Sequence, residues 1–446
     1  MKASSSTKMK KTLISEQSPT PALKHLDVLL NEKRVGIIER TKTGKQRLVY
    51  DQAWSDNPKA IPVSRSLPLS KTAHATTTTA NFMWGLLPDN GVVLDAWGSR
   101  YKVSANNPFG LLAAVGEDCP GAIQLLKPGT DLTKREGVKW ITETDLNDRI
   151  KALRADPGAA RSIDDKGRVS LPGAQTKTAL YKTGSKWGVP NGRTPTTHIL
   201  KPEPTAYPGL ASNEHFTLLL LRELGLPSPE SQVLNCGDIS VFVTQRYDRY
   251  VAKDGLVKRI HQEDMCQALG LPPSKKYQSE GGPGIPDVME ILKFSEEPEE
   301  DRNRFMRAQA LNFIVANSDA HAKNYSILYA SGGRFRLAPL YDVACLGVFQ
   351  KDSSPIELAM TIGGERRLQK ILPRHWEKLA ATVGYDKDRA LAHVRDLLAR
   401  LPGMALSVRS KCVADSLSVS VIDTVIDNLW HRVRALAAVY GAEFLA

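Results

Sequence analysis

The sequence predicts an α+β fold in which strand-rich units precede a mainly helical half. A chain of 446 residues exceeds what one hydrophobic core usually serves, so two or three packed units are expected. Apolar and polar residues alternate from Leu26, and strand-like runs continue to about Arg249. From Gln262 onward the apolar positions recur at helical spacing. Apolar residues make up 41% and charged residues 24% of the chain, the balance of an ordinary globular protein.

Composition narrows the class of protein further. The five cysteines are odd in number and far apart, so buried free thiols are expected rather than disulfides or a zinc site. They are Cys119, Cys236, Cys266, Cys345 and Cys412. No apolar run approaches bilayer-spanning length and none follows the basic N-terminus, which predicts a cytoplasmic protein without a membrane partner. The net charge of +12 favours nucleic acid, nucleotide phosphates or an acidic protein as partners, although it also fits a merely soluble basic protein.

The N-terminal part is expected to contain a tail and a small β-rich unit. Residues 1–23 are rich in Ser, Thr and Lys without an apolar period, which predicts a flexible tail. Residues 24–126 open with strand-like alternation around Gly and Lys turn signals and are expected to form a β-rich subdomain. Its later elements are expected to be helices over 92–101 and 109–116 and a strand over 122–126.

The middle of the chain, residues 127–255, is predicted to form a second strand-rich unit. It begins with a helix-like, acid-rich segment over 141–156, and strands dominate over 168–249. One helix is expected within this region. It is predicted to begin at Glu214 behind the capping pair Ser212-Asn213, because an apolar helical period follows that pair.

Residues 256–446 are predicted to be mainly helical. Apolar residues at helical spacing around Phe313 and again over 422–440 indicate two helices. One hairpin interrupts this half, with strands over 325–330 and 334–337 joined by a Gly-rich turn.

The start of this hairpin lies beside residues suited to phosphoryl transfer. Asp319 and Asn324 have the D-x-x-x-x-N spacing of kinase catalytic loops, where the Asp orients the attacking hydroxyl and the Asn ligates a metal. The end of the hairpin delivers a second carboxylate, Asp342, where kinases place a metal-binding Asp. Each carboxylate alone is typical of a turn or a helix cap. Together they predict a catalytic Asp319 and a Mg²⁺ site at Asn324 and Asp342.

The strand-rich middle offers groups that could hold nucleotide phosphates. Lys201 ends a β-prone run and could neutralise phosphate charge, although an exposed strand-end lysine is the alternative. Glu214 could pair with Lys201, although an acidic first-turn residue also complements the helix dipole. The small-residue loop 170–178 could present backbone N–H groups to phosphate, and by composition alone it also fits an ordinary turn.

Further polar residues allow two interpretations each. His321 and Lys323 lie inside the catalytic block and could contact ATP, while a structural role fits the histidine equally well. A basic cluster in the helical half could meet DNA phosphates, but such a cluster is usually a solvated face. It comprises Arg366, Arg367, Lys370, Arg374 and His375.

Together these blocks resemble the HipA family of bacterial toxin kinases from about Leu26 to Tyr440. The matching blocks are SLPLS, NFMWGLLPDN, RVSLPGAQTKTAL, TPTTHILK, VTQRYDR, EDMCQALGLPPSKKYQSEGGPGI, NSDAHAKN and APLYDVA. The resemblance implies a two-lobed protein-kinase-like fold with an extra N-terminal β-rich subdomain, as in full-length HipA. Residues 127–255 would form the N-lobe with phosphate loop and hinge, and residues 256–446 a helical C-lobe with the catalytic and metal-binding loops.

The resemblance also implies residue roles. Asp319 takes the catalytic base position, Asn324 and Asp342 hold Mg²⁺, and Glu214 supports Lys201 as an ion pair. The implied ATP-binding residues are Pro172, Gly173, Ala174, Gln175, Thr176, Lys177, Lys201, Gln245, Arg246, Tyr247, His321, Lys323, Asn324, Tyr341 and Asp342. Gln245 stands where the family's hinge usually opens with Glu. Ser170 matches the serine that HipA kinases autophosphorylate, and about two added charges beside a phosphate-binding loop would repel nucleotide.

The same resemblance implies partners and leaves two alternatives. Family members phosphorylate glutamyl-tRNA synthetase or another aminoacyl-tRNA synthetase and are neutralised by a helix-turn-helix, HipB-like antitoxin that carries them onto operator DNA. One alternative is a small-molecule kinase of the aminoglycoside or choline type, against which the N-terminal unit and the GAQTK loop argue. The other is a non-catalytic DNA-associated co-repressor, which the joint presence of Lys201, Asp319 and Asp342 disfavours.

Overall fold

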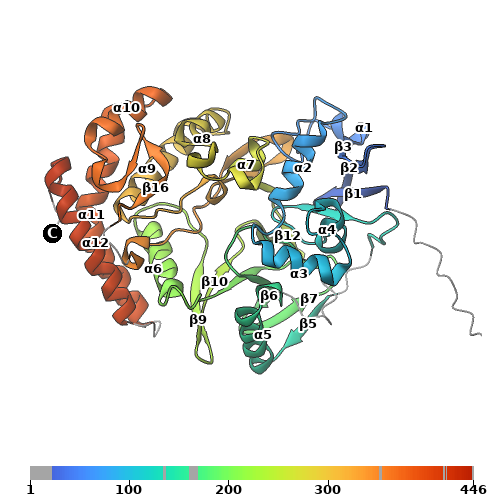
Figure 1. The fold of residues 1–446 in the computed structure, drawn as a ribbon, viewed down its shortest axis with the longest axis horizontal. Coiled ribbons are helices and arrows are strands. Elements are labelled where there is room, and N and C mark those ends of the chain that lie inside the picture. Colours follow the sequence, from blue (N-terminus) through green and yellow to red (C-terminus); the bar gives the residue numbers. More distant parts are fainter. Residues whose placement is uncertain are drawn as a thin grey trace, which may run out of the picture.

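The computed structural model describes residues 23–133, 137–159, 169–350, 354–414, 417 and 419–443. The tail expected over residues 1–23 therefore lies outside the described residues except for Leu23. The molecule is elongated, with the N-terminal unit at one end, the C-terminal helices at the other, and the larger sheet between them (Figure 1).

The N-terminal unit is a four-stranded antiparallel sheet with helices on one side. Its sheet has the order β3-β2-β1-β4. The strands are β1 (His25–Leu30), β2 (Lys33–Arg40), β3 (Gln46–Tyr50) and β4 (Ile123–Leu126). The helices are α1 (Gln52–Ser55), α2 (Thr76–Gly85), α3 (Gly91–Tyr101) and α4 (Pro108–Val115), so the helices expected over 92–101 and 109–116 are confirmed. Asn90 caps α3 by accepting from the backbone N–H of Val92, which ends the loop 86–90 at a defined position.

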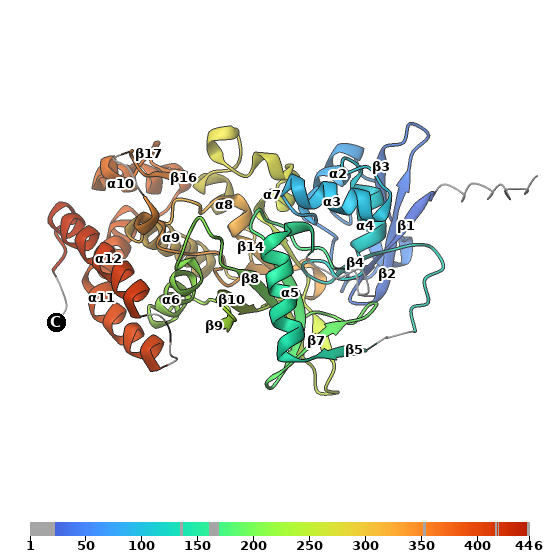
Figure 2. The ribbon, with the colours of Figure 1, turned by 60° about the horizontal axis from the view of Figure 1, so that its bottom comes forward.

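The second sheet forms the middle of the molecule. Its six strands have the order β5-β7-β6-β8-β10-β9. They are β5 (Val138–Ile141), β6 (Thr178–Thr183), β7 (Lys186–Pro190), β8 (His198–Pro202), β9 (Ser231–Cys236) and β10 (Ile239–Gln245). The expected acid-rich helix is α5 (Glu143–Ala155), which begins with a Thr142–Asp145 capping box. Leu146 and Ile150 of α5 share a hydrophobic core with the sheet, and Figure 2 shows the helix lying across it.

The helix expected from Glu214 begins four residues earlier, so that prediction is wrong in its boundary. Helix α6 spans Leu210–Glu223 behind Gly209, whose φ of 87° is left-handed. Asn213 does not cap the helix because its side chain pairs with the backbone of Cys345 through both its oxygen (2.8 Å) and its nitrogen (3.0 Å). A tertiary contact therefore uses the side chain that local sequence assigned to a cap.

The C-terminal half packs around one large hydrophobic core that also takes in α6. Its helices are α7 (Met265–Ala268), α8 (Ile285–Leu292), α9 (Pro298–Ile314), α10 (Pro373–Val383), α11 (Lys387–Ala414) and α12 (Val419–Tyr440). Its strands are β11 (Arg249–Val251), β12 (Val257–Arg259), β13 (Gln262–Asp264), β14 (Ser326–Tyr329), β15 (Phe335–Leu337), β16 (Glu357–Ile362) and β17 (Glu365–Arg367). The expected hairpin is confirmed as β14 and β15, to which β13 adds a third strand. The expectation of one hairpin in this half is wrong, because β16 and β17 pair antiparallel around the positive-φ turn Gly363-Gly364.

Short 3-10 helices connect several of these elements. They are η1 (Pro157–Ala159), η2 (Pro273–Lys275), η3 (Gln278–Glu280), η4 (Ala322–Asn324), η5 (Ser331–Gly333), η6 (Leu346–Phe349) and η7 (Leu368–Lys370). All five cysteines are buried free thiols, as expected. Among the helices of the described ranges, none combines the length and the apolar character that crossing a bilayer requires.

Candidate active site

A cavity that is partly open to solvent lies where the six-stranded sheet, the loop 170–177 and the C-terminal half meet. Most of the residues expected to act on ATP line it. They are Pro172, Gly173, Ala174, Gln175, Lys177, Lys201, Glu214, Arg246, Tyr247, Asp319, His321, Lys323, Asn324, Tyr341 and Asp342. Thr176 and Gln245 do not line this cavity.

Lys201 of β8 contacts two carboxyl groups that line the cavity. Its Nζ lies 2.7 Å from Glu214 Oε1 of α6 and also contacts Asp342. Burial disfavours the charged amine, but Asp342 and Glu214 outweigh it and raise the pKa of Lys201 above its ordinary range. Burial likewise opposes ionisation of Asp342, yet Lys201 and Lys177 lower the pKa of that carboxyl to about 2. Burial raises the pKa of Glu214 to about 7, so Lys201 and Asp342 form the charged pair and Glu214 accepts a further hydrogen bond from the amine.

Asp342 and Asn324 offer two oxygen ligands on the same wall. Asn324 donates its Nδ2 to the backbone oxygen of Asp319 (2.8 Å), so its amide oxygen is the atom left for a cation. Asp342 has a φ of 55°, a left-handed conformation that a non-glycine residue rarely adopts outside functional turns. Both residues line the main cavity and a smaller one beside it. Carboxylate and amide oxygens fit Mg²⁺, which prefers hard oxygen ligands.

Asp319 stands at the open side of the cavity. Its side chain is exposed, and its Oδ1 accepts a hydrogen bond from the Tyr277 hydroxyl at 2.6 Å. His321 is buried beside it, with its ring edge-on to Tyr277 at 5.0 Å. Burial lowers the pKa of His321, although Asp319 opposes the shift, and its Nδ1 has no hydrogen-bond partner among the described residues. The imidazole is therefore neutral near pH 7.

Lys323 is held by a carboxylate of the N-terminal unit. Its Nζ lies 2.9 Å from Asp89 Oδ1 and 3.8 Å from Asp264 Oδ2. The other oxygen of Asp89 accepts from Lys276 at 3.3 Å. The loop 86–90 of the N-terminal unit thus reaches the loop 319–324. No spacing signal in the sequence indicated this contact.

The loop 170–177 closes on itself and packs against the N-terminal unit. Lys177 donates its Nζ to the carbonyl of Pro172 at 2.9 Å, which closes the loop on itself. Gly173 has a φ of 103°, and an added Cβ would lie 2.6 Å from the Lys177 Nζ. The backbone N–H of Asp89 donates to the Gly173 carbonyl at 3.2 Å. Thr176 lines a second, small cavity behind the loop.

Ser170 is fully buried at the base of this loop. Its hydroxyl donates to the backbone oxygen of Leu86 at 2.6 Å, and its backbone N–H donates to that of Asp118 at 3.1 Å. In this conformation the N-terminal unit covers the hydroxyl. Ser170 can reach a phosphoryl donor only if the loop leaves its place.

The side chains of the expected hinge, residues 245–247, lie in three different places: at the surface, at the cavity and in the protein interior. Gln245 is exposed, and its backbone N–H donates to the Glu230 carbonyl at 2.8 Å. Tyr247 faces the cavity, where its ring stacks on Tyr341 with centroids 5.5 Å apart. Arg246 borders the cavity, but its guanidinium is buried among ion pairs.

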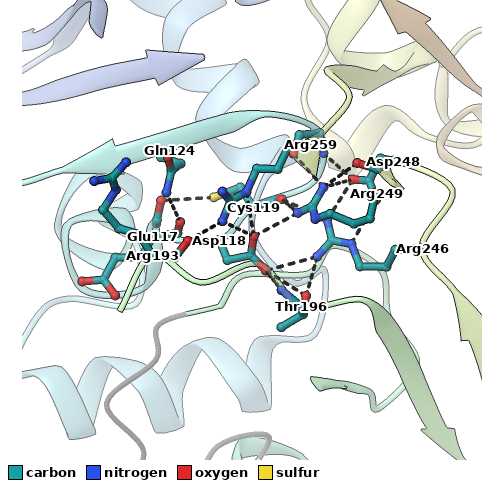
Figure 3. Close-up of polar contacts among 12 residues, drawn as sticks. Glu117, Asp118, Cys119, Gln124, Arg193, Thr196, Arg246, Asp248, Arg249 and Arg259 are labelled. Carbon is teal, nitrogen blue, oxygen red and sulfur yellow. Dashed lines mark hydrogen bonds and ion pairs between the residues drawn. The ribbon is translucent and has the colours of Figure 1, made fainter. Parts of the chain in front are cut away.

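That buried ionic cluster locks the hinge to the N-terminal unit, as Figure 3 shows. Arg249 and Arg259 each place a guanidinium nitrogen 2.9 Å from Asp118 Oδ1, and Arg246 lies 2.8 Å from Asp248 Oδ2. Although burial opposes ionisation of Asp118, the three arginines hold its pKa far below the usual range. The loop around Asp118 is therefore tied to the strand that leads into the helical half.

The basic cluster of the helical half is partly neutralised. Arg366 lies 3.3 Å from Glu357, and Arg367 lies 3.1 Å from Glu365. Glu365 also accepts from the backbone N–H groups of both arginines. These ion pairs favour the interpretation of a solvated face for this part of the cluster.

Two family models and several known proteins match most of this chain. Residues 26–126 match the family model of the HipA N-terminal domain, and residues 169–404 match that of the HipA-like C-terminal domain. Y4mE of Sinorhizobium fredii, a provisionally named kinase, is 36% identical over 363 residues, covering 80% of this chain and 86% of that protein. The serine/threonine-protein kinase toxin HipA of Shewanella oneidensis is 27% identical over 390 residues, covering 84% of this chain and 87% of that protein.

A solved structure shows the same architecture. The chain superposes on one from the complex of Shewanella oneidensis HipA, HipB and operator DNA with a TM-score of 0.81 and 23% identity. The superposition covers 94% of this chain and 100% of the other. The expected α+β fold, two kinase-like lobes with an extra N-terminal β-rich subdomain and a mainly α-helical C-terminal lobe, is therefore confirmed.

Proposed function

Because this chain belongs to the HipA family, we propose that it is a toxin serine/threonine-protein kinase that transfers the γ-phosphate of ATP to a protein serine. The observation that carries the proposal is the meeting of Lys201, Glu214 and Asp342 in the cavity that Asp319 also lines. Phosphoryl transfer relies on positioning and charge neutralisation, and these are the groups it requires.

The nucleotide would lie along the cavity from the hinge to the catalytic loop. The adenine would sit near Tyr247, and the phosphates would meet Lys201, Lys177 and the loop 172–177. Both lysines line the cavity, and the loop offers backbone N–H groups around a left-handed Gly173. Gln245 and Thr176 face away from this cavity, so contacts through their side chains are not part of the proposal.

Asn324 and Asp342 would hold Mg²⁺ between them and the nucleotide. The ion would neutralise charge on the phosphate oxygens when bound. In this structure the Lys201 amine forms an ion pair with Asp342. On nucleotide binding the amine would leave Asp342 and contact Glu214 and the phosphates instead. Asp319 would accept the hydrogen bond of the attacking serine hydroxyl and orient it for in-line attack.

The target and partners are proposed from the family. An aminoacyl-tRNA synthetase such as glutamyl-tRNA synthetase is the proposed substrate, in the bacterial cytosol. A HipB-like helix-turn-helix antitoxin is the proposed partner, and operator DNA would be met through that complex. The net charge of +12 supports association with a DNA-bound assembly.

Ser170 is the proposed site of self-inactivation. Phosphate on its hydroxyl would add about two charges where the structure has a buried neutral contact with Leu86. The loop could not then keep its place against the N-terminal unit. Its displacement would remove Lys177 and the loop backbone from the nucleotide site.

The test is phosphoryl transfer from labelled ATP with Mg²⁺, by the purified protein alone and with a bacterial lysate. Asp319→Asn should abolish the labelling of protein, because the attacking hydroxyl loses its base. Asp254→Asn is the matched control, since Asp254 is an exposed carboxylate paired only with Lys258 among the ion pairs of the described residues. Label on Ser170 and on a synthetase supports the proposal. Labelling that survives Asp319→Asn would refute it.

A further inference from the structure

The hydroxyl of Tyr277 stands where an acceptor hydroxyl would bind. A base and the hydroxyl that it orients must lie within about 2.6–3.2 Å of each other. The Tyr277 hydroxyl donates to Asp319 Oδ1 at 2.6 Å, inside the cavity that Lys201 and Asp342 also line. The phenol therefore makes the hydrogen bond that a substrate serine would make.

The ring is fixed in this place by its loop. Ala322 of the catalytic loop donates its backbone N–H to the Lys276 carbonyl at 3.2 Å. Gly282 donates to the Tyr277 carbonyl at 3.0 Å, and the side-chain oxygen of Gln278 accepts from Thr361 of β16 at 2.7 Å. The loop is thus fastened both to the catalytic loop and to the strand pair that follows the metal-binding segment.

Water is the competitor that this arrangement would exclude. The phenol occupies Oδ1 of the otherwise exposed Asp319, so a water molecule can donate to that oxygen only when the phenol leaves it. In serine phosphorylation a bond forms between the serine oxygen and the γ-phosphorus, the bond from that phosphorus to the bridging oxygen of ADP breaks, and the hydroxyl proton passes to Asp319. In hydrolysis the water oxygen attacks instead, and the products are ADP, inorganic phosphate and a proton.

We propose that Tyr277 determines acceptor selectivity: its phenol occupies the acceptor position at Oδ1 of Asp319, keeps water from that oxygen, and yields only to a protein hydroxyl. The proposal rests on the proposed kinase function. The contact between Gln278 and β16 gives a protein bound along that strand a direct way to shift the loop and release Asp319. A small acceptor such as water has no such contact.

The test compares two rates in the full-length protein: phosphate release from ATP·Mg²⁺ without an acceptor, and labelling of proteins in a bacterial lysate. Tyr277→Phe keeps the ring and removes the hydroxyl, so acceptor-free hydrolysis should rise roughly fivefold or more, the value of about one hydrogen bond. Labelling should stay within about twofold of wild type. Adding Asp319→Asn to Tyr277→Phe should abolish the rise.

Two further variants make the test specific. Tyr385→Phe removes another partly buried hydroxyl, which donates to Asn303 at 2.8 Å away from the cavity, and should change neither rate. Gln278→Ala releases the loop without touching the phenol and should raise hydrolysis in the same direction. It serves as the second variant should Tyr277→Phe lower the melting temperature.

The outcomes separate the two proposals. Equal loss of hydrolysis and labelling in Tyr277→Phe would make Tyr277 a structural support and overturn the inference. Phosphate found on Tyr277 itself would also overturn it, because the phenol would then be an acceptor. Normal labelling with unchanged hydrolysis in both variants would overturn the inference alone. The absence of Asp319-dependent labelling in the wild type would overturn the proposed function and this inference with it.

Discussion

Lys177 should make nucleotide binding depend on pH. Burial lowers the pKa of Lys177 to about 8, and the neighbouring Lys201 acts in the same direction. A bound triphosphate places opposite charge beside the amine and restores its pKa toward the ordinary value of about 10.5. Below pH 8 the amine is charged in both states, so affinity is constant. Above pH 8 binding must take up a proton, and affinity falls.

The size of the effect follows from proton linkage. With a pKa of about 8 in the free protein and about 10.5 in the complex, the apparent Kd should rise roughly tenfold between pH 7 and pH 9. Lys177→Arg keeps the charge at every pH in this range, since an arginine is always protonated. Its Kd should therefore stay flat between pH 7 and pH 9.

The assay is isothermal titration of a non-hydrolysable ATP analogue with Mg²⁺ at half-unit steps from pH 7 to pH 9, in two buffers of different ionisation enthalpy. The wild type should take up close to one proton per nucleotide at pH 9 and almost none at pH 7, while Lys177→Arg should take up none. A flat wild-type profile, or the same tenfold rise in Lys177→Arg, would show that Lys177 is not the titrating group.

Three more substitutions test other parts of the site. Lys201→Met should lower protein labelling by about 100-fold, because it removes the amine that contacts both Glu214 and Asp342; labelling near the wild-type rate would refute the role of this lysine. Asp118→Asn should lower the free energy of unfolding by about 3–5 kcal/mol, since it leaves buried arginines without their shared partner. Asp27→Asn, at a surface ion pair, should cost less than about 1 kcal/mol, and equal losses in urea denaturation would contradict the argument. Gly173→Ala should weaken ATP binding more than Gly184→Ala, because both positions have positive φ but only the first has an atom within 3 Å of the added methyl group; equal KM values would count against the loop's role.

The sequence placed the candidate catalytic residues near one another because they belong to one local unit. Asp319, Asn324 and Asp342 lie on either side of the β14–β15 hairpin, so their spacing along the chain constrains their spacing in the fold. Lys201 followed from a β-prone run ending in a cation, and that strand does border the same cavity. Their chemical roles remain the proposal that the labelling experiment tests.

Contacts between distant segments left no such signal. Asp89 precedes its partner Lys323 by 234 residues, and the turn that carries it has an ordinary turn composition. Tyr277 is 42 residues from Asp319 in a loop that only the resemblance had marked. Neither pairing follows from periodicity or spacing, because the intervening chain can bring any exposed loop to the cavity.

A local capping signal also gave a wrong helix start, because the side chain concerned makes a tertiary contact instead. The pair Ser212-Asn213 has the composition of a helix cap, yet α6 starts at Leu210. Cys345, from the segment after the metal-binding loop, takes both polar atoms of Asn213. In this way the buried backbone N–H and carbonyl of Cys345 both gain hydrogen-bond partners. Two such bonds stabilise the fold more than one side-chain cap, and α6 can begin behind Gly209 without a cap.

The sequence by itself determined the fold class, the change from a strand-rich part to a mainly helical half and the local block that carries Asp319, Asn324 and Asp342, because apolar periodicity and short-range spacing act within single elements. The tertiary structure alone decided which charges neutralise Lys201 and Lys323, what covers Ser170, and that a phenol occupies the catalytic carboxylate. Those outcomes depend on burial, which raises the free energy of any unpaired charge and therefore selects partners by proximity in the fold rather than along the chain.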